Sequence, residues 1–316
     1  MPLPDCDVRR TILVIHPGAI GDVLLSVPAM RRLRIRYPQH QVVLCAKESI
    51  AEVLLGGVVI DARMSVDGIA CADLFEPDAP CKGELKEWLS RCDCAIAWMQ
   101  DPDGNVTKSL RTAGAKEAIV RSPFSSGIKA THQSDRFCEI VDGVGAPRAE
   151  FDPMPISDDL RARGLACLDN FGIGIVRPLV MVHPGSGSPQ KSVAVREMAE
   201  MIARLHGEGI SPVVIEGPAD KKYVDDLSES LSFPVPVLRG VSLATLAGAL
   251  TYANLFVGHD SGVTHLAALL GVRTVAIFGP TDSSRWAPLG SHVTVMEGPP
   301  PSVSLIASLR LTTINA

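Results

Sequence analysis

Asn254–Gly279 reads NLFVGHDSGVTHLAALLGVRTVAIFG, and this stretch decides the expected fold class of the 316-residue chain. An apolar run ends at Asp260, a short helical run HLAALL follows, and TVAIF resumes the apolar pattern of a buried strand. Gly271 suits the left-handed position that ends many helices. The stretch therefore predicts a compact β-α-β unit, the building block of an α/β fold.

The polar residues of this unit gather where its helix begins. Free backbone N–H groups and the helix dipole favour anions at such an end, so we expect it to bind the diphosphate of a nucleotide. An ordinary N-cap and a first-turn histidine are the alternative, because a cap needs only one side-chain oxygen. The crowding of four suitable residues favours the anion site: Asp260, Ser261, Gly262 and His265.

The composition is typical of an α/β protein. Hydrophobic residues make up 46% of the chain and aromatic residues only 4%, as in layers of Val, Ile, Leu and Ala. The length is sufficient for two ordinary domains. The formal net charge of −5 argues against nucleic acid as a partner. One basic run, MRRLRIRYP at 30–38, is expected to be a solvated helix face, with an acidic acceptor or anionic lipid as the alternative.

The cysteines and the termini indicate a compartment. The eight cysteines form no CxxC pair and no metal-ligand spacing, so we expect reduced thiols. The N-terminal MPLPDCDVRR lacks an apolar signal-peptide core, and no apolar stretch reaches the ~18 residues of a membrane span. We expect a cytoplasmic protein whose membrane association, if any, is peripheral, on the inner face of the cytoplasmic membrane.

Two similar openings suggest two similar halves. TILVIHPGAIGD (Thr11–Asp22) and LVMVHPGSGSPQK (Leu179–Lys191) are each an apolar strand that runs into His-Pro-Gly and a loop of small residues. Pro and Gly at 155–178 fit a hinge, so we expect one Rossmann-like domain over residues 1–160 and a second over residues 161–316.

Strands and helices alternate along both halves, which predicts parallel sheets covered by helices. We expect strands at 11–16, 42–45, 95–99, 117–120, 179–183, 212–216, 235–238, 255–257 and 274–278. Helices are expected up to residue 36 and at 106–112, 195–206, 220–230, 242–251 and 265–270, and a short helical segment is expected within 150–178. Ligands of such folds bind beyond the carboxyl ends of the strands.

Three features of the second half suit a nucleotide. The loop with Gly185, Ser186 and Gly187 can approach phosphate closely, and Lys191 lies within reach, although the spacing is not that of a Walker A loop. In EGPADKK, Asp220 is either a ribose acceptor or an N-cap, and the sequence favours neither.

Asp22 is the candidate catalytic residue of the first half. It follows the first strand in GAIGD, where a carboxylate can accept the proton of an attacking hydroxyl; an N-cap is the alternative. Pro28 implies a kink or a late helix start with Ser26 as cap. We expect a β-turn at Asp101-Pro-Asp103-Gly and a strand edge at Cys92-Asp-Cys94, so no metal site is predicted.

Together these stretches resemble glycosyltransferase family 9, the heptosyltransferases of bacterial lipopolysaccharide core assembly. The resemblance rests on ILVIHPGAIGDVLLSVPAMRRLRIRYP, HPGSGSPQK and LATLAGALTYANLFVGHDSGVTHLAALLGVRTVAIFGPTDSSRWAPLG. It implies a GT-B fold, with two Rossmann-like domains facing a central cleft, acceptor in the first and nucleotide-sugar donor in the second. It also implies inverting transfer without metal or other cofactor, from ADP-heptose to a lipopolysaccharide core acceptor.

The resemblance also implies a role for each matching residue. Asp22 is the expected base, Lys191 contacts the donor phosphates beside the Ser186–Gly187 loop, and Asp220 holds ribose. The backbone at Val241 faces adenine, while diphosphate and sugar are held by Asp260, Ser261, Gly262 and His265. Many relatives carry Trp where this chain has Val193, so the packing of that loop does not follow from the resemblance.

Two other functions fit the same sequence features. A sugar-nucleotide epimerase of this fold would keep the donor site without an acceptor site, and a non-catalytic module would bind a nucleotide-sugar without turnover. NAD-dependent oxidoreduction is disfavoured, because neither loop has GxGxxG with an acid about twenty residues further on. Turnover of a nucleotide-sugar with and without an acceptor distinguishes the three.

Overall fold

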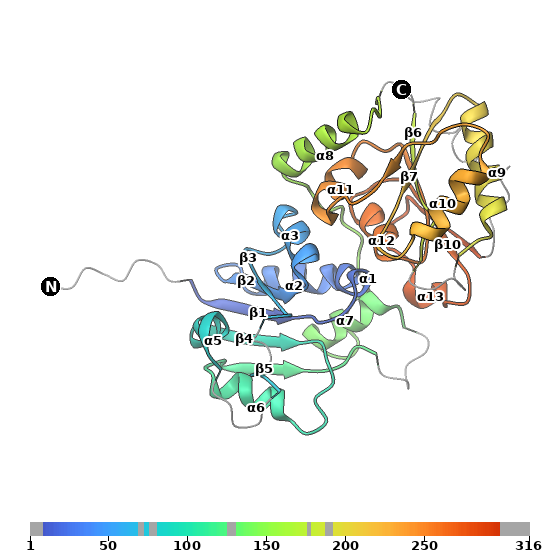
Figure 1. Ribbon diagram of the computed structural model, residues 1–316. Coiled ribbons are helices and arrows are strands. Elements are labelled where there is room, and N and C mark those ends of the chain that lie inside the picture. The colour runs from blue at the N-terminus through green and yellow to red at the C-terminus, as the bar shows by residue number, and fades with distance from the viewer. Residues whose placement is uncertain are drawn as a thin grey trace. The chain divides into compact units, whose positions relative to one another are not determined.

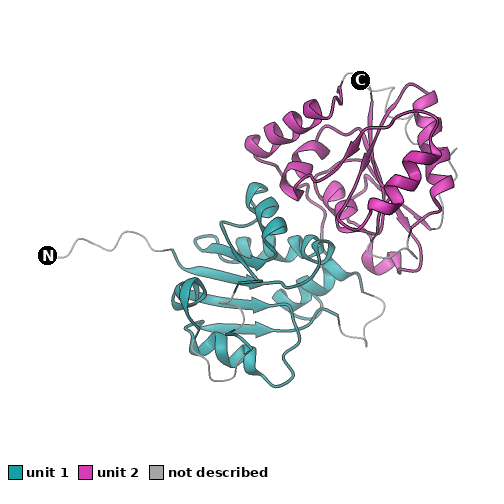
Figure 2. Cartoon of the chain, in the orientation of Figure 1, with its two compact units in different colours: residues 1–149 teal, residues 150–316 magenta. Residues whose placement is uncertain are grey.

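The computed structural model describes residues 9–68, 73–75, 81–124, 131–175, 178–186 and 192–297. The chain forms two compact units, residues 1–149 (unit 1) and 150–316 (unit 2), coloured separately in Figure 2. The division predicted after residue 160 falls inside the helix Asp158–Asn170, which packs within unit 2. In the described ranges, none of the helices combines the length and the apolar character needed to cross a membrane.

Unit 1 is built on a parallel sheet of order β3-β2-β1-β4-β5 (Figure 1). Its strands are β1 (Thr11–Ile15), β2 (Gln41–Ala46), β3 (Ala62–Ser65), β4 (Cys92–Ala97) and β5 (Glu117–Val120). The helices are α1 (Ile20–Leu25), α2 (Val27–Arg36), α3 (Glu48–Gly56), α5 (Gly83–Ser90), α6 (Asn105–Thr112) and α7 (Gln133–Asp142). Every residue of the central strand β1 is buried, so both faces of the sheet are covered.

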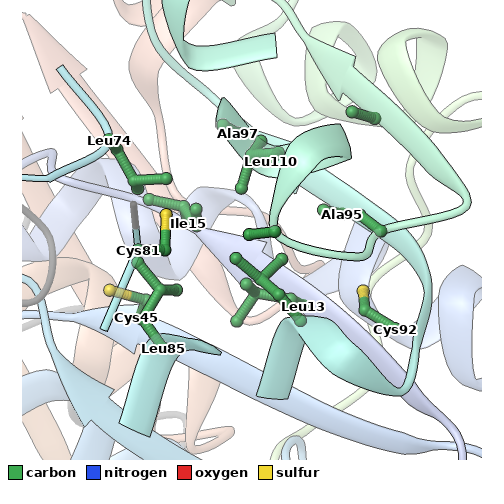
Figure 3. Packing of buried hydrophobic residues seen from close by; sticks show 14 of the residues in the cluster. Leu13, Ile15, Cys45, Leu74, Cys81, Leu85, Cys92, Ala95, Ala97 and Leu110 are labelled. Atoms are coloured by element: carbon green, nitrogen blue, oxygen red, sulfur yellow. The ribbon is translucent and has the colours of Figure 1, made fainter. Parts of the chain in front are cut away.

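On one face of the unit 1 sheet, the core lies between the strands and helices α5 and α6 (Figure 3). Leu13 and Ile15 of β1 pack there with Leu85, Leu110 and three buried thiols. The thiols are Cys45, Cys81 and Cys92. All six cysteines in the described part of the chain are buried thiols without a disulfide bond, and burial raises the pKa of Cys92 to about 11. Such thiols are packing residues with little thiolate to react.

Unit 2 has a parallel sheet of order β11-β10-β9-β6-β7-β8. Its strands are β6 (Leu179–His183), β7 (Ser211–Ile215), β8 (Val237–Leu238), β9 (Leu255–His259), β10 (Thr274–Phe278) and β11 (Val293–Glu297). The helices are α8 (Asp158–Asn170), α9 (Val195–Gly207), α10 (Lys221–Ser230), α11 (Leu243–Leu250), α12 (Gly262–Leu269) and α13 (Ser283–Trp286). Apolar residues of α9 and α10 cover one face of the sheet.

The expected alternation of strands and helices is confirmed, including the β9-α12-β10 unit. Pro28 lies in the first turn of α2, which begins after α1 ends, as a late helix start requires. Ser26 stands at the N-cap position, but its hydroxyl donates to the carbonyl of Val23 instead of capping α2. The structure adds α3, β3, α5, α7, α13 and β11 to the predicted elements.

The basic run of α2 makes contacts inside unit 1. Arg32 forms an ion pair with Asp142 of α7 and donates to two backbone carbonyls, and Arg34 pairs with Asp61. Arg36 donates to the carbonyl of Val141. Arg32 and Arg34 are half-buried and Arg36 is exposed, so the expected solvated face is confirmed only in part. The same arginines also hold α2 to α7 and to the loop before β3.

Candidate functional site

Three neighbouring strands of unit 2 bring polar residues to one edge of the sheet. The parallel strands β9, β6 and β7 lie side by side, with His183 in register with Gly258. The segments that follow these strands therefore emerge at the same edge. They carry Pro184–Ser186, Glu216–Asp220 and Asp260–Ser261. Val241 follows the adjacent strand β8 and is half-buried.

The turn after β9 is a capped helix start. Ser261 is the N-cap of α12 in an extended conformation, and its hydroxyl accepts from the N–H of Thr264 at 3.4 Å. Thr264 in turn donates to the carbonyl of His259. His265 is 6% exposed and Asp260 is half-buried. Ser261 is thus an N-cap, and this role leaves the other first-turn N–H groups of the helix for a ligand.

A chain of hydrogen bonds connects the three loops. His183, the last residue of β6, places Nε2 at 3.1 Å from Asp220 Oδ2 and Nδ1 at 3.2 Å from Ser261 Oγ. The Asp220 carboxylate also accepts from the N–H of Gly217 at 3.0 Å. The side chains of His183 and Asp220 are 6% and 8% exposed. A buried carboxylate, an imidazole and a hydroxyl therefore follow one another across three strand ends.

The side chain of Asp220 does not act as an N-cap, and its carboxylate is already hydrogen-bonded inside the protein, where a ribose contact was the other expected role. Asp220 is at the N-cap position of α10, but its side chain makes no cap hydrogen bond. Burial pushes the pKa of Asp220 upward, while the hydrogen bonds from His183 and Gly217 outweigh burial and hold the pKa below its usual value. A Cβ at Gly185 would lie 2.0 Å from this carboxyl group, so only glycine leaves room for it.

His259 anchors the segment that enters α9. Its Nε2 accepts from the N–H of Val193 at 2.8 Å, and burial lowers the pKa of His259 to about 4, so the ring stays neutral and can accept. The hydroxyl of Tyr223 donates to the carbonyl of Val193 at 2.6 Å. Ser186 and Ser192 are joined by a hydrogen bond of 3.0 Å. Hydrogen bonds to both its N–H and its carbonyl therefore fix the backbone of Val193.

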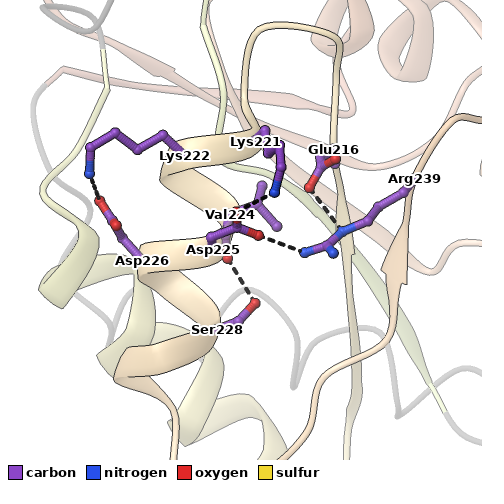
Figure 4. A network of polar contacts seen from close by, with 8 residues as sticks. All are labelled: Glu216, Lys221, Lys222, Val224, Asp225, Asp226, Ser228 and Arg239. Carbon is purple, nitrogen blue, oxygen red and sulfur yellow. Dashed lines mark hydrogen bonds and ion pairs between the residues drawn. The ribbon is translucent and has the colours of Figure 1, made fainter.

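Ion pairs fix α10 against the end of β7 (Figure 4). Arg239 lies between Glu216, at 2.9 Å, and Asp225, at 3.1 Å. Lys221 also pairs with Asp225. These contacts position the loop from Glu216 to Asp220, although solvent screens the exposed pairs and each alone contributes little to stability.

Asp22 lies in the first turn of α1, directly beyond β1. Its carboxylate accepts from the N–H of Ala19 at 3.3 Å and is half-buried. Nearby His16 is fully buried against Trp98, and its Nδ1 accepts from the N–H of Gly18 at 3.1 Å. Burial lowers the pKa of His16 to about 4. The arrangement presents a carboxylate at a strand end beside a neutral, tightly packed ring.

Asp101 has a local structural role. Its carboxylate accepts from the N–H groups of Val106 and Thr107 and from the Thr107 hydroxyl, so it caps α6. Burial raises the pKa of Asp101, but these bonds prevail and lower it overall. Asp103 is exposed on the preceding turn. A search of the described residues finds no group of three His, Cys, Asp or Glu side chains that could hold a metal ion.

Most of the predicted donor residues follow the strand ends of unit 2: Ser186, Asp220, Val241, Asp260, Ser261, Gly262 and His265. The other two, Gly187 and Lys191, lie outside the described residues. The sequence interpretation assigned no role to His183 or His259, which join these loops. The signal available was the repeated His-Pro-Gly at the ends of β1 and β6, with a histidine that also precedes Asp260.

Comparison with known proteins identifies relatives of this arrangement. The model of glycosyltransferase family 9 (heptosyltransferase) matches residues 130–302, more than half of the chain. Lipopolysaccharide heptosyltransferase 3 of Escherichia coli strain K12 is 26% identical over 297 residues, 86% of this chain and 83% of that protein. Lipopolysaccharide core heptosyltransferase OpsX of Haemophilus influenzae is 24% identical over 306 residues, 89% and 82% of the two chains. A second Escherichia coli heptosyltransferase 3 matches over only 38% of its length, at 28% identity.

Solved structures show the same fold. The Escherichia coli ADP-heptose lps heptosyltransferase II has a TM-score of 0.80 at 19% identity, covering 97% of this chain and all of that one. The family 9 glycosyl transferase of Veillonella parvula has a TM-score of 0.75 at 20% identity, covering 96% and 89%. The likeness shows that the chain has the GT-B fold, with two Rossmann-like α/β units.

Proposed function

Because the chain belongs to glycosyltransferase family 9, we propose that it transfers heptose from ADP-heptose to an acceptor in the lipopolysaccharide core. The observation that carries the proposal is the convergence of the strand-end loops of unit 2 on the capped start of α12. The names of the relatives that match most of the chain support the same donor sugar and acceptor class.

The donor is proposed to lie along the strand ends of unit 2. The N-terminal turn of α12, with Ser261, Gly262 and His265, receives the diphosphate, and Asp260 accepts hydrogen bonds from sugar hydroxyls. We propose that the loop from Ser186 to Lys191 contacts the phosphates and that the backbone at Val241 faces adenine. The ribose contact expected for Asp220 competes with the bonds that its carboxylate makes to His183 and Gly217.

The reaction is proposed to be a single inverting displacement. The acceptor hydroxyl oxygen attacks the anomeric carbon while Asp22 takes its proton, and the bond to the diphosphate breaks with its electron pair leaving on ADP. Lys191 and the α12 N-terminus offset the developing charge of the leaving group, so the transfer needs no metal ion. We further propose a cytoplasmic site of action with peripheral contact at the inner membrane.

Substitution of Asp22 tests the catalytic assignment. We expect Asp22→Asn to lower transfer by roughly 10²–10⁴-fold, the usual contribution of a general base, while ADP binding is retained. Asparagine keeps an oxygen for the Ala19 N–H, so the helix start is preserved. Asp103→Asn, at an exposed turn, is the matched control and should leave transfer unchanged. Near wild-type turnover of Asp22→Asn would refute the assignment.

The same assay separates the competing functions. Mass spectrometry of ADP-heptose with the enzyme, with and without a truncated core lipid, distinguishes transfer from epimerisation and from binding without turnover. Transfer should persist in EDTA. Activity that disappears with EDTA and returns with Mg²⁺ would overturn the metal-independent proposal.

A further inference from the structure

The hydrogen-bonded chain from Asp220 through His183 to Ser261 has a definite proton arrangement. Nε2 of His183 faces the Asp220 carboxylate, which can only accept, so Nε2 carries a hydrogen. In the neutral ring Nδ1 is then an acceptor for the Ser261 hydroxyl, whose oxygen is 3.2 Å away. Thr264 Oγ1, at 3.1 Å, is the other acceptor for this hydroxyl, because the Thr264 hydrogen goes to the carbonyl of His259. The Ser261 oxygen meanwhile accepts from the Thr264 N–H. With His183 neutral, the Ser261 hydrogen therefore points into the protein.

A diphosphate at the α12 N-terminus needs donors, because its oxygens only accept. A proton added at Nδ1 of His183 reverses the bond, so that the imidazolium donates to Ser261 Oγ. The Ser261 hydrogen then leaves Nδ1, and a diphosphate oxygen, as a charged acceptor, competes for it with the neutral Thr264 Oγ1. The nearby Asp220 carboxylate offsets the positive charge, as an opposite charge does for a buried imidazolium.

We propose that binding of the donor diphosphate draws one proton onto His183, and that Asp220 and His183 are positioning residues that turn the Ser261 hydroxyl toward the ligand. The inference rests on the proposed function, since it takes the start of α12 as the diphosphate site. It assigns Asp220 a role in the protein interior, in agreement with its 7% exposure.

The surroundings of His183 determine where the proton goes. Asp220 at the start of α10 is an anion, whereas His259 on β9 is neutral, because burial lowers its pKa to about 4. The turn that carries Ser261 adds one carboxylate, Asp260, and one imidazole, His265. Glu216, on the loop after β7, is paired with Arg239. His183 is the imidazole that directly contacts both a carboxylate and the capping hydroxyl.

Calorimetric titration of the full-length enzyme with ADP-heptose, without acceptor, tests the proposal. At pH 7.0–8.5, in buffers of different ionisation enthalpy, we expect the heat to report uptake of up to one proton per donor bound. Affinity should then fall with rising pH, by up to about tenfold per pH unit where the uptake is complete, because a proton is taken up on binding. ADP-heptose is the probe because both phosphates of its diphosphate are esterified, so the ligand does not titrate near neutral pH.

Variants assign the proton to a residue. His183→Gln should abolish the uptake and flatten the dependence of affinity on pH, and Asp220→Asn should reduce the uptake. His206→Gln, on α9 and stacked on Phe233, is the matched control and should retain the uptake. His265→Gln should weaken binding but keep the proton count. Loss of uptake in His265→Gln and its retention in His183→Gln would overturn the proposal.

The heat of ADP-heptose binding to the wild-type enzyme tests the proposal even where a variant does not fold. Binding of ADP-heptose with no buffer-dependent heat overturns this inference and leaves the proposed function intact. Failure of the wild-type enzyme to bind ADP-heptose at all overturns the proposed function, and the inference with it.

Discussion

Gly248→Ala should destabilise unit 2, although alanine is the better helix former. Helices α8 and α11 cross with their backbones in contact at Gly164 and Gly248. A Cβ at Gly248 would lie 1.8 Å from the carbonyl oxygen of Leu160 and 3.0 Å from the nitrogen of Gly164. These are backbone atoms of a packed helix, so no side-chain rotation relieves the overlap.

The magnitude follows from that overlap. Carbon atoms in good contact are roughly 3.5–4.0 Å apart, so the helices would have to separate by about 1.5 Å or more. Even a gap of about 1 Å forfeits up to half of the dispersion energy across an interface, and overpacking typically costs about 1–3 kcal/mol. The gain in helix propensity, about 1 kcal/mol, does not offset these losses. With the cost at the upper end of that range, we expect a net loss of about 2 kcal/mol and a midpoint lower by about 4–8 °C.

Differential scanning calorimetry and urea unfolding monitored by circular dichroism measure this change. The matched control is Gly207→Ala in the last turn of α9, where an added Cβ meets nothing within 4 Å. That variant should be unchanged or gain up to about 1 kcal/mol. A Gly248→Ala protein as stable as the Gly207→Ala protein would show that α8 and α11 can separate freely, and the close-crossing argument would be refuted.

Two further substitutions test the site and the stability of unit 1. Gly185→Ala places a methyl group against the buried Asp220 carboxyl. We expect calorimetry to show an affinity for ADP-heptose at least tenfold weaker, and an affinity that no longer depends on pH. Asp93→Asn should cost about 1 kcal/mol at pH 7, since the hydrogen bond from Arg10 holds the pKa of Asp93 below its usual range. The stabilisation by Asp93 is present above the unfolded-state pKa of about 3.9 and is lost as the pH falls toward the pKa of the folded state. In urea unfolding, the difference in free energy of unfolding between the wild type and Asp93→Asn should therefore become smaller in acid.

The elements that the sequence predicts well are those buried on both faces. β6, β9 and β10 are entirely buried, and their continuous apolar runs mark them clearly. β11 escapes this pattern because it is an edge strand, and the residues of VTVME are half-buried or exposed. α7 begins with His132, whose ring accepts from the N–H of Ser134, and a histidine cap is not a helix-start signal in sequence.

The sequence predicts which residues lie beyond the strand ends, but not which of these residues contact one another. Apolar runs place Asp22, Asp220 and Asp260 just beyond strand ends, where ligands of α/β folds bind. The contact between His183 and Ser261 joins residues 78 positions apart. It exists because β6 lies between β9 and β7, and a one-dimensional pattern of strands and helices does not contain that order. The choice between ribose acceptor and N-cap for Asp220 therefore could not be made from EGPADKK.

The repeated His-Pro-Gly shows how one motif acquires two electrostatic roles. In unit 1, His16 is enclosed by the rings of Trp98 and Phe137, and its Nδ1 accepts from a backbone N–H two residues on. Burial without a charged partner lowers its pKa to about 4, so the ring is neutral at neutral pH. In unit 2, the same position in the motif meets a carboxylate and a hydroxyl. There an added proton has a carboxylate to offset its charge, which is why we place the proton linkage of donor binding at His183.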